Sequence, residues 1–132
     1  MLSLMARNKK KGQSLVEFAL ILPILLLIVV GIIEFGILMS SYLIVQNTAR
    51  DAVRQISVGA VDSAVFTTVR QNAVGIDRNQ LSFTATPSSA TRTRGNPVTV
   101  TTTYNHQILT PLLSVVLGTT LQWQVSATMR LE

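Results

Sequence analysis

An apolar run from Leu15 to Ile33 carries a single charged side chain, Glu17, and no other feature constrains the chain as strongly. As a helix, the run spans about 28 Å, which is close to the thickness of the hydrocarbon core of a bilayer. It is apolar on all sides, whereas a helix at the surface of a soluble domain is apolar on one face. We therefore expect a transmembrane helix over residues 15–39.

A cleaved secretory signal is the alternative for an apolar run so close to the N-terminus. Its apolar region usually has about 7–15 residues and ends at a small-x-small cleavage site. The run in this chain is longer, and it continues past Ile33 as EFGILMSSYLIV without such a site. These features favour a retained membrane anchor.

Positive charge is concentrated before the apolar run. The chain has a net charge of +5, and four basic residues precede Gln13 with no acidic residue among them: Arg7, Lys9, Lys10 and Lys11. Because basic flanks remain in the cytoplasm, residues 1–12 are expected inside and the part after the span outside. Nucleic acid is not an expected partner, since binding it needs basic residues clustered on the folded part of the chain.

The helix is predicted to continue beyond the membrane. After Ser40, apolar residues recur every three or four positions and polar residues fill the gaps, a pattern typical of an amphipathic helix. The apolar positions are Tyr42, Val45, Ala49, Ala52, Val53 and Ile56. We thus expect one helix over residues 13–57, of which residues 40–57 pack against a folded domain outside the membrane.

Residues 58–132 are predicted to form a small domain, which gives the chain an α+β fold. A short helix capped by Asp62 or Ser63 and stopped by Gly75 is expected first. Three stretches then alternate apolar and polar residues with the period of a strand: 81–86, 98–104 and 121–131. They predict an antiparallel sheet of roughly three strands, packed on the amphipathic part of the long helix.

Three details of this domain follow from the same pattern. The third strand alternates most strongly, so Leu121, Trp123 and Val125 are expected to be buried against the helix. The polar segment 87–97, bounded by prolines, indicates an exposed hairpin loop. The segment 106–118 is too apolar for a free loop, and it could cover the sheet, enter a neighbouring subunit or touch the membrane surface.

The residues that usually carry catalysis are scarce. The chain has no cysteine and one histidine, His106, which we expect to be an ordinary, partly exposed side chain at a strand end. Aspartates and arginines lie close in sequence, which indicates solvated pairs: Asp51, Asp62 and Asp77 near Arg50, Arg54, Arg70 and Arg78. No phosphate-binding glycine loop or Gly-x-Ser-x-Gly motif is present. We expect no enzymatic activity, no cofactor, no metal site and no small-molecule substrate.

The glycine before the apolar run and the glutamate inside it have a characteristic spacing. Lys9-Lys10-Lys11-Gly12 followed by Gln13-Ser14-Leu15-Val16-Glu17 resembles the processing signature of prepilins. GQSLVEFALILPILLLIVVGIIEFG closely resembles the start of TadE-like proteins, the pseudopilins of Tad (tight adherence) pilus systems. QNTARDAVRQ and SATMRLE are also similar to that family. The resemblance is specific over residues 10–56 and general over residues 60–120.

The resemblance implies that a membrane-embedded prepilin peptidase cuts between Gly12 and Gln13. Glu17 would then be the fifth residue of the mature chain. The amine created on Gln13 of one subunit could pair with Glu17 of a neighbour, so that neither charge is left alone among packed apolar helices. Removing the partner of a buried ion costs about 3–5 kcal/mol, enough to enforce one axial register. Glu17 is therefore expected to act in assembly.

Further positions are candidates for helix packing in an assembled pilus: Phe18, Pro23, Gly31, Glu34 and Gly36. Proline is tolerated in membrane helices, and glycine is frequent there. Glu34 either reaches the outer headgroup region or meets a partner in an oligomer. Major Tad pilins are shorter and have Tyr after the glutamate, where this chain has Phe18 and a folded C-terminal domain. The resemblance therefore implies a minor pilin or pseudopilin rather than the main shaft subunit.

Such a protein would be a structural or assembly component of an adhesive pilus. It would cross the bacterial cytoplasmic membrane once, and its partners would be other pilins and pilus-assembly proteins, the prepilin peptidase and the lipid bilayer. The alternative is a stand-alone single-pass membrane protein whose external domain binds an envelope partner. A mass measurement separates these two readings, since processing would remove residues 1–12.

Overall fold

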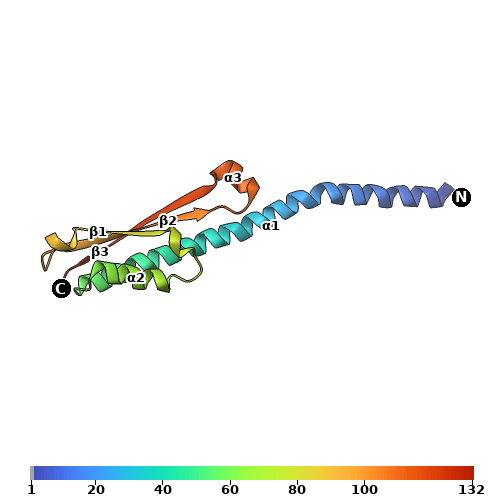
Figure 1. Cartoon of the computed structure of the whole chain (residues 1–132). Coiled ribbons are helices and arrows are strands. Elements are labelled where there is room, and N and C mark those ends of the chain that lie inside the picture. The colour runs from blue at the N-terminus through green and yellow to red at the C-terminus, as the bar shows by residue number, and fades with distance from the viewer. Residues whose placement is uncertain (1) are drawn as a thin grey trace. The chain divides into compact units, whose positions relative to one another are not determined.

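The computed structural model describes the backbone of residues 2–132 and the side chains of residues 12–132 other than those at positions 112 and 116. The chain forms two compact units, Met1–Phe35 and Gly36–Glu132, here called the N-terminal unit and the C-terminal unit. The α+β fold is confirmed: a long apolar helix precedes a three-stranded antiparallel sheet, which packs on the later part of that helix (Figure 1).

The long helix α1 (Leu2–Ser57) supplies the described part of the N-terminal unit and the first element of the C-terminal unit. In the unprocessed chain the helix includes the basic leader, ahead of residue 13, where the mature helix is expected to begin. Leu, Met, Ala, Arg and Lys are frequent in the leader and are good helix formers, and Gly12 costs only about 1 kcal/mol relative to alanine. The basic side chains of the leader lie outside the described side chains: Arg7, Lys9, Lys10 and Lys11.

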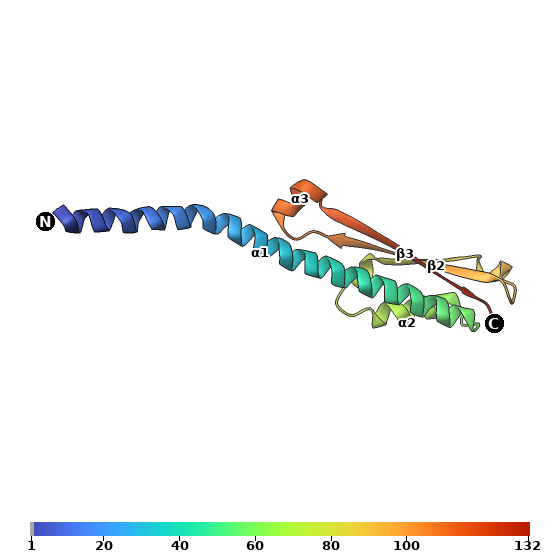
Figure 2. The same ribbon diagram turned by 180° about the vertical axis from the view of Figure 1, so that it is seen from behind.

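The remaining elements of the C-terminal unit are helices, strands and short 3-10 turns. They are α2 (Asp62–Asn72), η1 (Arg78–Gln80), β1 (Leu81–Thr86), η2 (Ser89–Thr91), β2 (Pro97–Gln107), α3 (Pro111–Leu117) and β3 (Thr120–Arg130). All three predicted strands are present, and β2 is longer than predicted at both ends. It is the central strand and pairs antiparallel with β1 and β3 (Figure 2).

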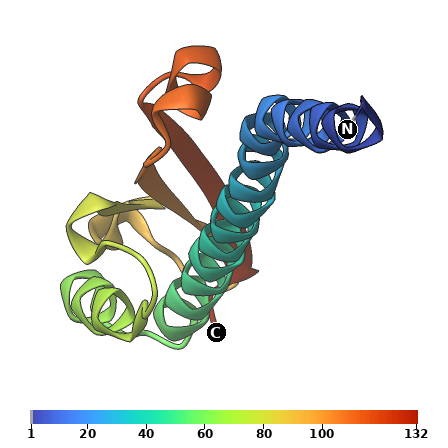
Figure 3. The same ribbon diagram turned by 90° about the vertical axis from the view of Figure 1, so that its right-hand side faces the viewer.

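The core of the C-terminal unit lies between the sheet and two helices. α2 lies beside the later part of α1, and the sheet packs across both (Figure 3). One cluster of buried side chains joins α1, α2 and β2: Ala52, Val53, Ile56, Val65, Val69, Val98 and Val100. A second joins Val45, Ala73, Leu81 and Tyr104. The buried α1 residues of both clusters lie on the apolar face that was predicted for residues 40–57. The recurrence of apolar residues every three or four positions therefore predicted this face correctly.

The third strand runs alongside α1 in the same direction. Near its start, the ring of Trp123 packs edge-on against Tyr42, with 5.4 Å between the ring centroids. After its end, the backbone N–H of Glu132 donates to the carbonyl of Ser57 at 2.9 Å. β3 is an edge strand, and its alternate apolar residues from Leu121 to Ala127 are half-buried. The prediction that Leu121, Trp123 and Val125 are buried is therefore wrong, although Trp123 and Val125 do pack against the cluster that contains Val45 of α1.

The start of α2 also differs from the prediction. The helix begins at Asp62, with Val61 as an N-cap residue that makes no side-chain capping bond, and it ends at Asn72, ahead of Gly75. Asp62 binds Arg92 instead of capping: Nη2 of Arg92 donates to Oδ2 at 2.7 Å, and Nη1 donates to Oδ1. This ion pair ties the first turn of α2 to the loop between β1 and β2, most of which is exposed as predicted.

Candidate functional site

The apolar side chains of the N-terminal unit are exposed in the single chain. Leu15 is 69% exposed, Ile24 61% and Phe35 64%. Among the described residues, α1 is the one helix long and apolar enough to cross a membrane. An exposed apolar surface of this extent needs lipid or other helices to cover it, because monomeric soluble proteins rarely expose large apolar patches. The helix is compatible with a single-pass membrane protein.

The predicted processing and register residues lie together near the start of this apolar surface. Gly12, Gln13 and Glu17 all lie within α1 and are exposed. Residues four apart share a helix face, and the side-chain amide Nε2 of Gln13 donates to the carboxylate Oε1 of Glu17 at 3.1 Å. A Cβ added at Gly12 would meet nothing within 4 Å. The fold itself thus does not require glycine at this position.

The candidate helix-packing residues are spread along α1. Phe18 is 59% exposed, and Pro23 lies exposed inside the helix. A Cβ added at Gly31 or Gly36 would also meet nothing within 4 Å, so there is open space beside both glycines. Glu34 differs from them, because it is buried in the single chain, with 6% exposure.

His106 is buried, with 7% exposure, and the prediction of a partly exposed side chain is wrong. The reason is that β2 continues past Tyr104, so His106 falls on the same inward face as Val98, Val100 and Tyr104. The Tyr104 and His106 rings lie 6.1 Å apart. The alternation of β2, extended by two residues, is the sequence signal that would have placed His106 inside.

Two of the predicted acid–arginine pairs are replaced by other contacts. Asp62 pairs with Arg92, thirty positions away. Asp77 accepts a hydrogen bond from the backbone N–H of Asn79 at 3.0 Å and caps η1. Arg70 donates to the carbonyl of Leu81 at 3.0 Å, and its guanidinium lies 5.7 Å from the ring centre of Phe83. These charged groups thus tie elements of the fold together.

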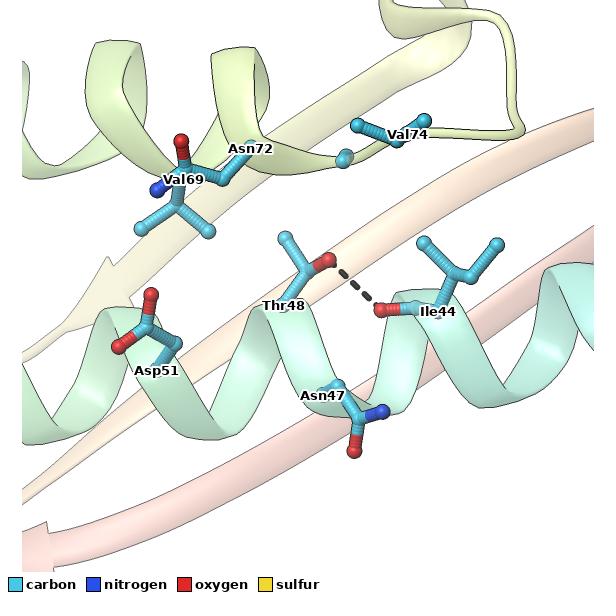
Figure 4. A pocket seen from close by; sticks show the side chains of 8 residues that line it. Ile44, Asn47, Thr48, Asp51, Val69, Asn72 and Val74 are labelled. Atoms are coloured by element: carbon cyan, nitrogen blue, oxygen red, sulfur yellow. Dashed lines mark hydrogen bonds between the residues drawn. The ribbon is translucent and has the colours of Figure 1, made fainter.

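A pocket of about 260 Å³ lies between α1 and α2 (Figure 4). Its apolar lining includes Ile44, Val69 and Val74, and Asp51 is its titratable side chain. The hydroxyl of Thr48 is already bound to the carbonyl of Ile44, at 2.7 Å. Nucleophilic catalysis needs a nucleophile and a base within hydrogen-bond reach of each other. The described residues that line this pocket include no such pair and no group of side chains that could bind a metal ion.

Comparison with known proteins finds a likeness along the long helix α1. A family model described as TadE-like protein matches residues 12–54. No curated protein and no solved structure matches the chain. The matched segment contains Gly12, Gln13 and Glu17, the exposed apolar surface, and the part of α1 that carries the sheet. The resemblance predicted from the sequence is thereby confirmed, and this chain carries a TadE-like segment at residues 12–54.

Proposed function

We propose that this protein is a minor pilin or pseudopilin of a Tad pilus system, a structural or assembly component without enzymatic activity. Its apolar helix would hold it in the bacterial cytoplasmic membrane and then pack against the helices of other pilins during assembly. The match over residues 12–54 supports association with a Tad pilus system. The minor pilin role is our own assignment.

The observation that carries the proposal is the exposed Glu17 at the start of an exposed apolar helix. Leu15, Val16 and Phe18, its neighbours in sequence, are 69%, 60% and 59% exposed. In a lone subunit the carboxylate can reach the inner headgroup region and stay hydrated. In a bundle of packed helices the same group would lose water and would need an ionic partner.

Cleavage between Gly12 and Gln13 would supply that partner. The new N-terminus would carry a cationic amine four residues before Glu17. A carboxylate has about four lone-pair sites, and the Gln13 amide uses one of them. Glu17 therefore retains acceptor capacity for the amine of a neighbouring subunit. An unpaired buried ion costs about 3–5 kcal/mol, so this pair would favour one axial register over its neighbours.

Gly12 suits the position before the cut for two reasons. It is exposed, so a peptidase can approach it. Glycine is also a poor helix former, by about 1 kcal/mol relative to alanine. The helix is thus easiest to open next to the scissile bond. In this proposal the prepilin peptidase recognises residues 9–17 on the cytoplasmic side, and the C-terminal unit lies outside the cell membrane.

Replacing Glu17 tests the proposal. Glu17→Gln keeps the shape and the acceptor oxygen but removes the charge, so the variant should insert and be cleaved normally. Its association with other pilins should fall by at least about 100-fold, the equivalent of about 3 kcal/mol. Co-purification of tagged protein with the other pilins, together with fibre counts, measures this. Normal piliation in the variant would remove the register role of Glu17.

A further inference from the structure

The connection between β2 and β3 presents apolar side chains to solvent. It consists of residues 108–119 and contains α3. Leu109 is 80% exposed, Val115 85% and Leu117 48%. A single exposed leucine is ordinary, but three exposed large apolar side chains on one short connection are an unusual concentration. They are here together called the patch.

This connection also lacks charge. The sequence contains no Asp, Glu, Lys or Arg between His106 and Arg130. Protein–protein interfaces usually have a polar rim around their apolar centre, whereas a segment that enters lipid avoids ionised groups because their desolvation is costly. Composition therefore favours lipid over a protein partner for this patch.

The connection lies at the end of the C-terminal unit where α1 enters it. Trp123 contacts Tyr42, while the opposite end of β3 leads to Glu132, which is bonded to Ser57. Going back from Trp123 to Thr120 covers about 10 Å along a strand. The same distance covers about six or seven residues of helix. The start of β3 is thus level with Gly36, the first residue of this unit.

The connection starts and ends at the same end of the sheet as the beginning of β3. A hydrogen bond from the N–H of Ile108 to the carbonyl of Thr119, 3.1 Å long, closes its base. Within the C-terminal unit, α3 projects from the end of the sheet that adjoins the first turns of α1 in this unit (Figures 1 and 2). The polypeptide reaches Gly36 directly from the apolar segment that is long enough to cross a membrane. The patch therefore lies at the end of the C-terminal unit at which the chain enters it.

We propose that the connection between β2 and β3 inserts the side chains of Leu109, Val115 and Leu117 into the outer surface of the lipid bilayer and forms a second membrane contact. Helices that lie in the interface bury their apolar face about 5–10 Å into the headgroup boundary. With no basic residue in the segment, insertion depends on apolar area and does not require anionic lipid. The contact fixes the distance of the C-terminal unit from the membrane. This inference rests on the membrane insertion of α1 in the proposed function.

Fluorescent labelling of the full chain in vesicles tests the inference. The chain has no cysteine, so Val115→Cys, Ala90→Cys and Ile24→Cys each give one site for an environment-sensitive dye. Ala90 lies in η2 on the exposed loop between β1 and β2, and Ile24 lies in the apolar run. The protein is reconstituted at no more than one chain per vesicle, in neutral phosphatidylcholine with or without brominated acyl chains.

We expect brominated lipid to quench the dye at positions 24 and 115 and to leave position 90 unchanged. Quenching at position 24 without quenching at position 115 would overturn this inference, whether the dye at 115 is exposed to water or covered by protein. The proposed insertion of α1 into the membrane would remain supported. Absence of quenching at 24 would overturn both. Leu109→Ser with Leu117→Ser in the Val115→Cys chain should reduce quenching at 115. Unchanged quenching there would show that the dye alone drives insertion and would overturn the inference.

Discussion

The side-chain amide of Gln13 donates a hydrogen bond to the carboxylate of Glu17 across 3.1 Å, on one face of α1. The two residues that the proposed processing and assembly steps use are therefore already in contact within one chain. Cleavage would add a second donor on Gln13, its backbone amine. In the proposed assembly, the amine pairs with Glu17 of a neighbouring subunit, whereas the side-chain amide binds Glu17 of its own chain. A substitution of the Gln13 side chain removes the amide and keeps the amine.

Gln13→Ala removes the side-chain amide and keeps the backbone nitrogen. Assembly should be retained in this variant, because the proposed partner of Glu17 is the amine of a neighbouring subunit. The measurement is co-purification with the other pilins, beside Glu17→Gln as the variant expected to fail. An equal loss of co-purification in Gln13→Ala and Glu17→Gln would show that assembly requires the intrachain hydrogen bond from the Gln13 side-chain amide, and not the amine.

Gly12→Ala should leave the fold intact and block or slow processing. The structure has open space at this position, and alanine favours a helix by about 1 kcal/mol over glycine, which makes the scissile region harder to open. The matched control is Gly36→Ala, another helical glycine with open space around it. Immunoblots should show that the unprocessed chain accumulates in the Gly12→Ala variant and not in the Gly36→Ala variant. Full processing of both variants would contradict the proposed site.

Arg92→Ala should destabilise the C-terminal unit by about 1–3 kcal/mol, the range for hydrogen bonds to charged groups. The side chains of Arg92 and Asp62 are 10% and 23% exposed, so the abandoned carboxylate would be partly buried. Arg94→Ala on the same loop is the control, since Arg94 is exposed and a surface change costs within about 0.5 kcal/mol. Urea unfolding of a fragment spanning residues 36–132 gives both values.

The same fragment tests the assignment of the core. Ile56 is 1% exposed, so Ile56→Ala should cost about 2–5 kcal/mol. Trp123 is half-buried on the edge strand, so Trp123→Ala should cost roughly 2 kcal/mol, less than the 3–5 kcal/mol of a fully buried tryptophan. A larger loss for Trp123 than for Ile56 would place the centre of the core at β3 instead of β2.

Periodicity predicted the elements of this fold well because both kinds of secondary structure repeat their side-chain direction over short distances. The apolar face with Val45, Ala49 and Ala52 and the strand 81–86 follow directly from such repeats. Periodicity does not say which strand is central. The strongest alternation belongs to the edge strand β3, while threonine-rich β2 holds the buried Val98 and Val100.

Contacts between residues far apart in sequence could not be predicted. Asp62 has arginine neighbours along the chain, yet it binds Arg92 because the loop after β1 passes the first turn of α2. The helix of the unprocessed chain begins at Leu2, because the boundary at residue 13 marks the predicted cleavage site and not a helix stop signal. The motif residues Gly12, Gln13 and Glu17 could be named from sequence, but the bond between Gln13 and Glu17 required the structure.

The intact mass of the protein extracted from cell membranes tests the central claim most directly. We predict a chain that begins at Gln13 with a free amine in cells that contain the prepilin peptidase, and the unprocessed chain in cells that lack it. A Gln13 terminus cyclised to pyroglutamate would carry no amine and would contradict the pairing with Glu17. An unprocessed chain with residues 1–12 still attached, recovered from assembled pili, would contradict the account as a whole.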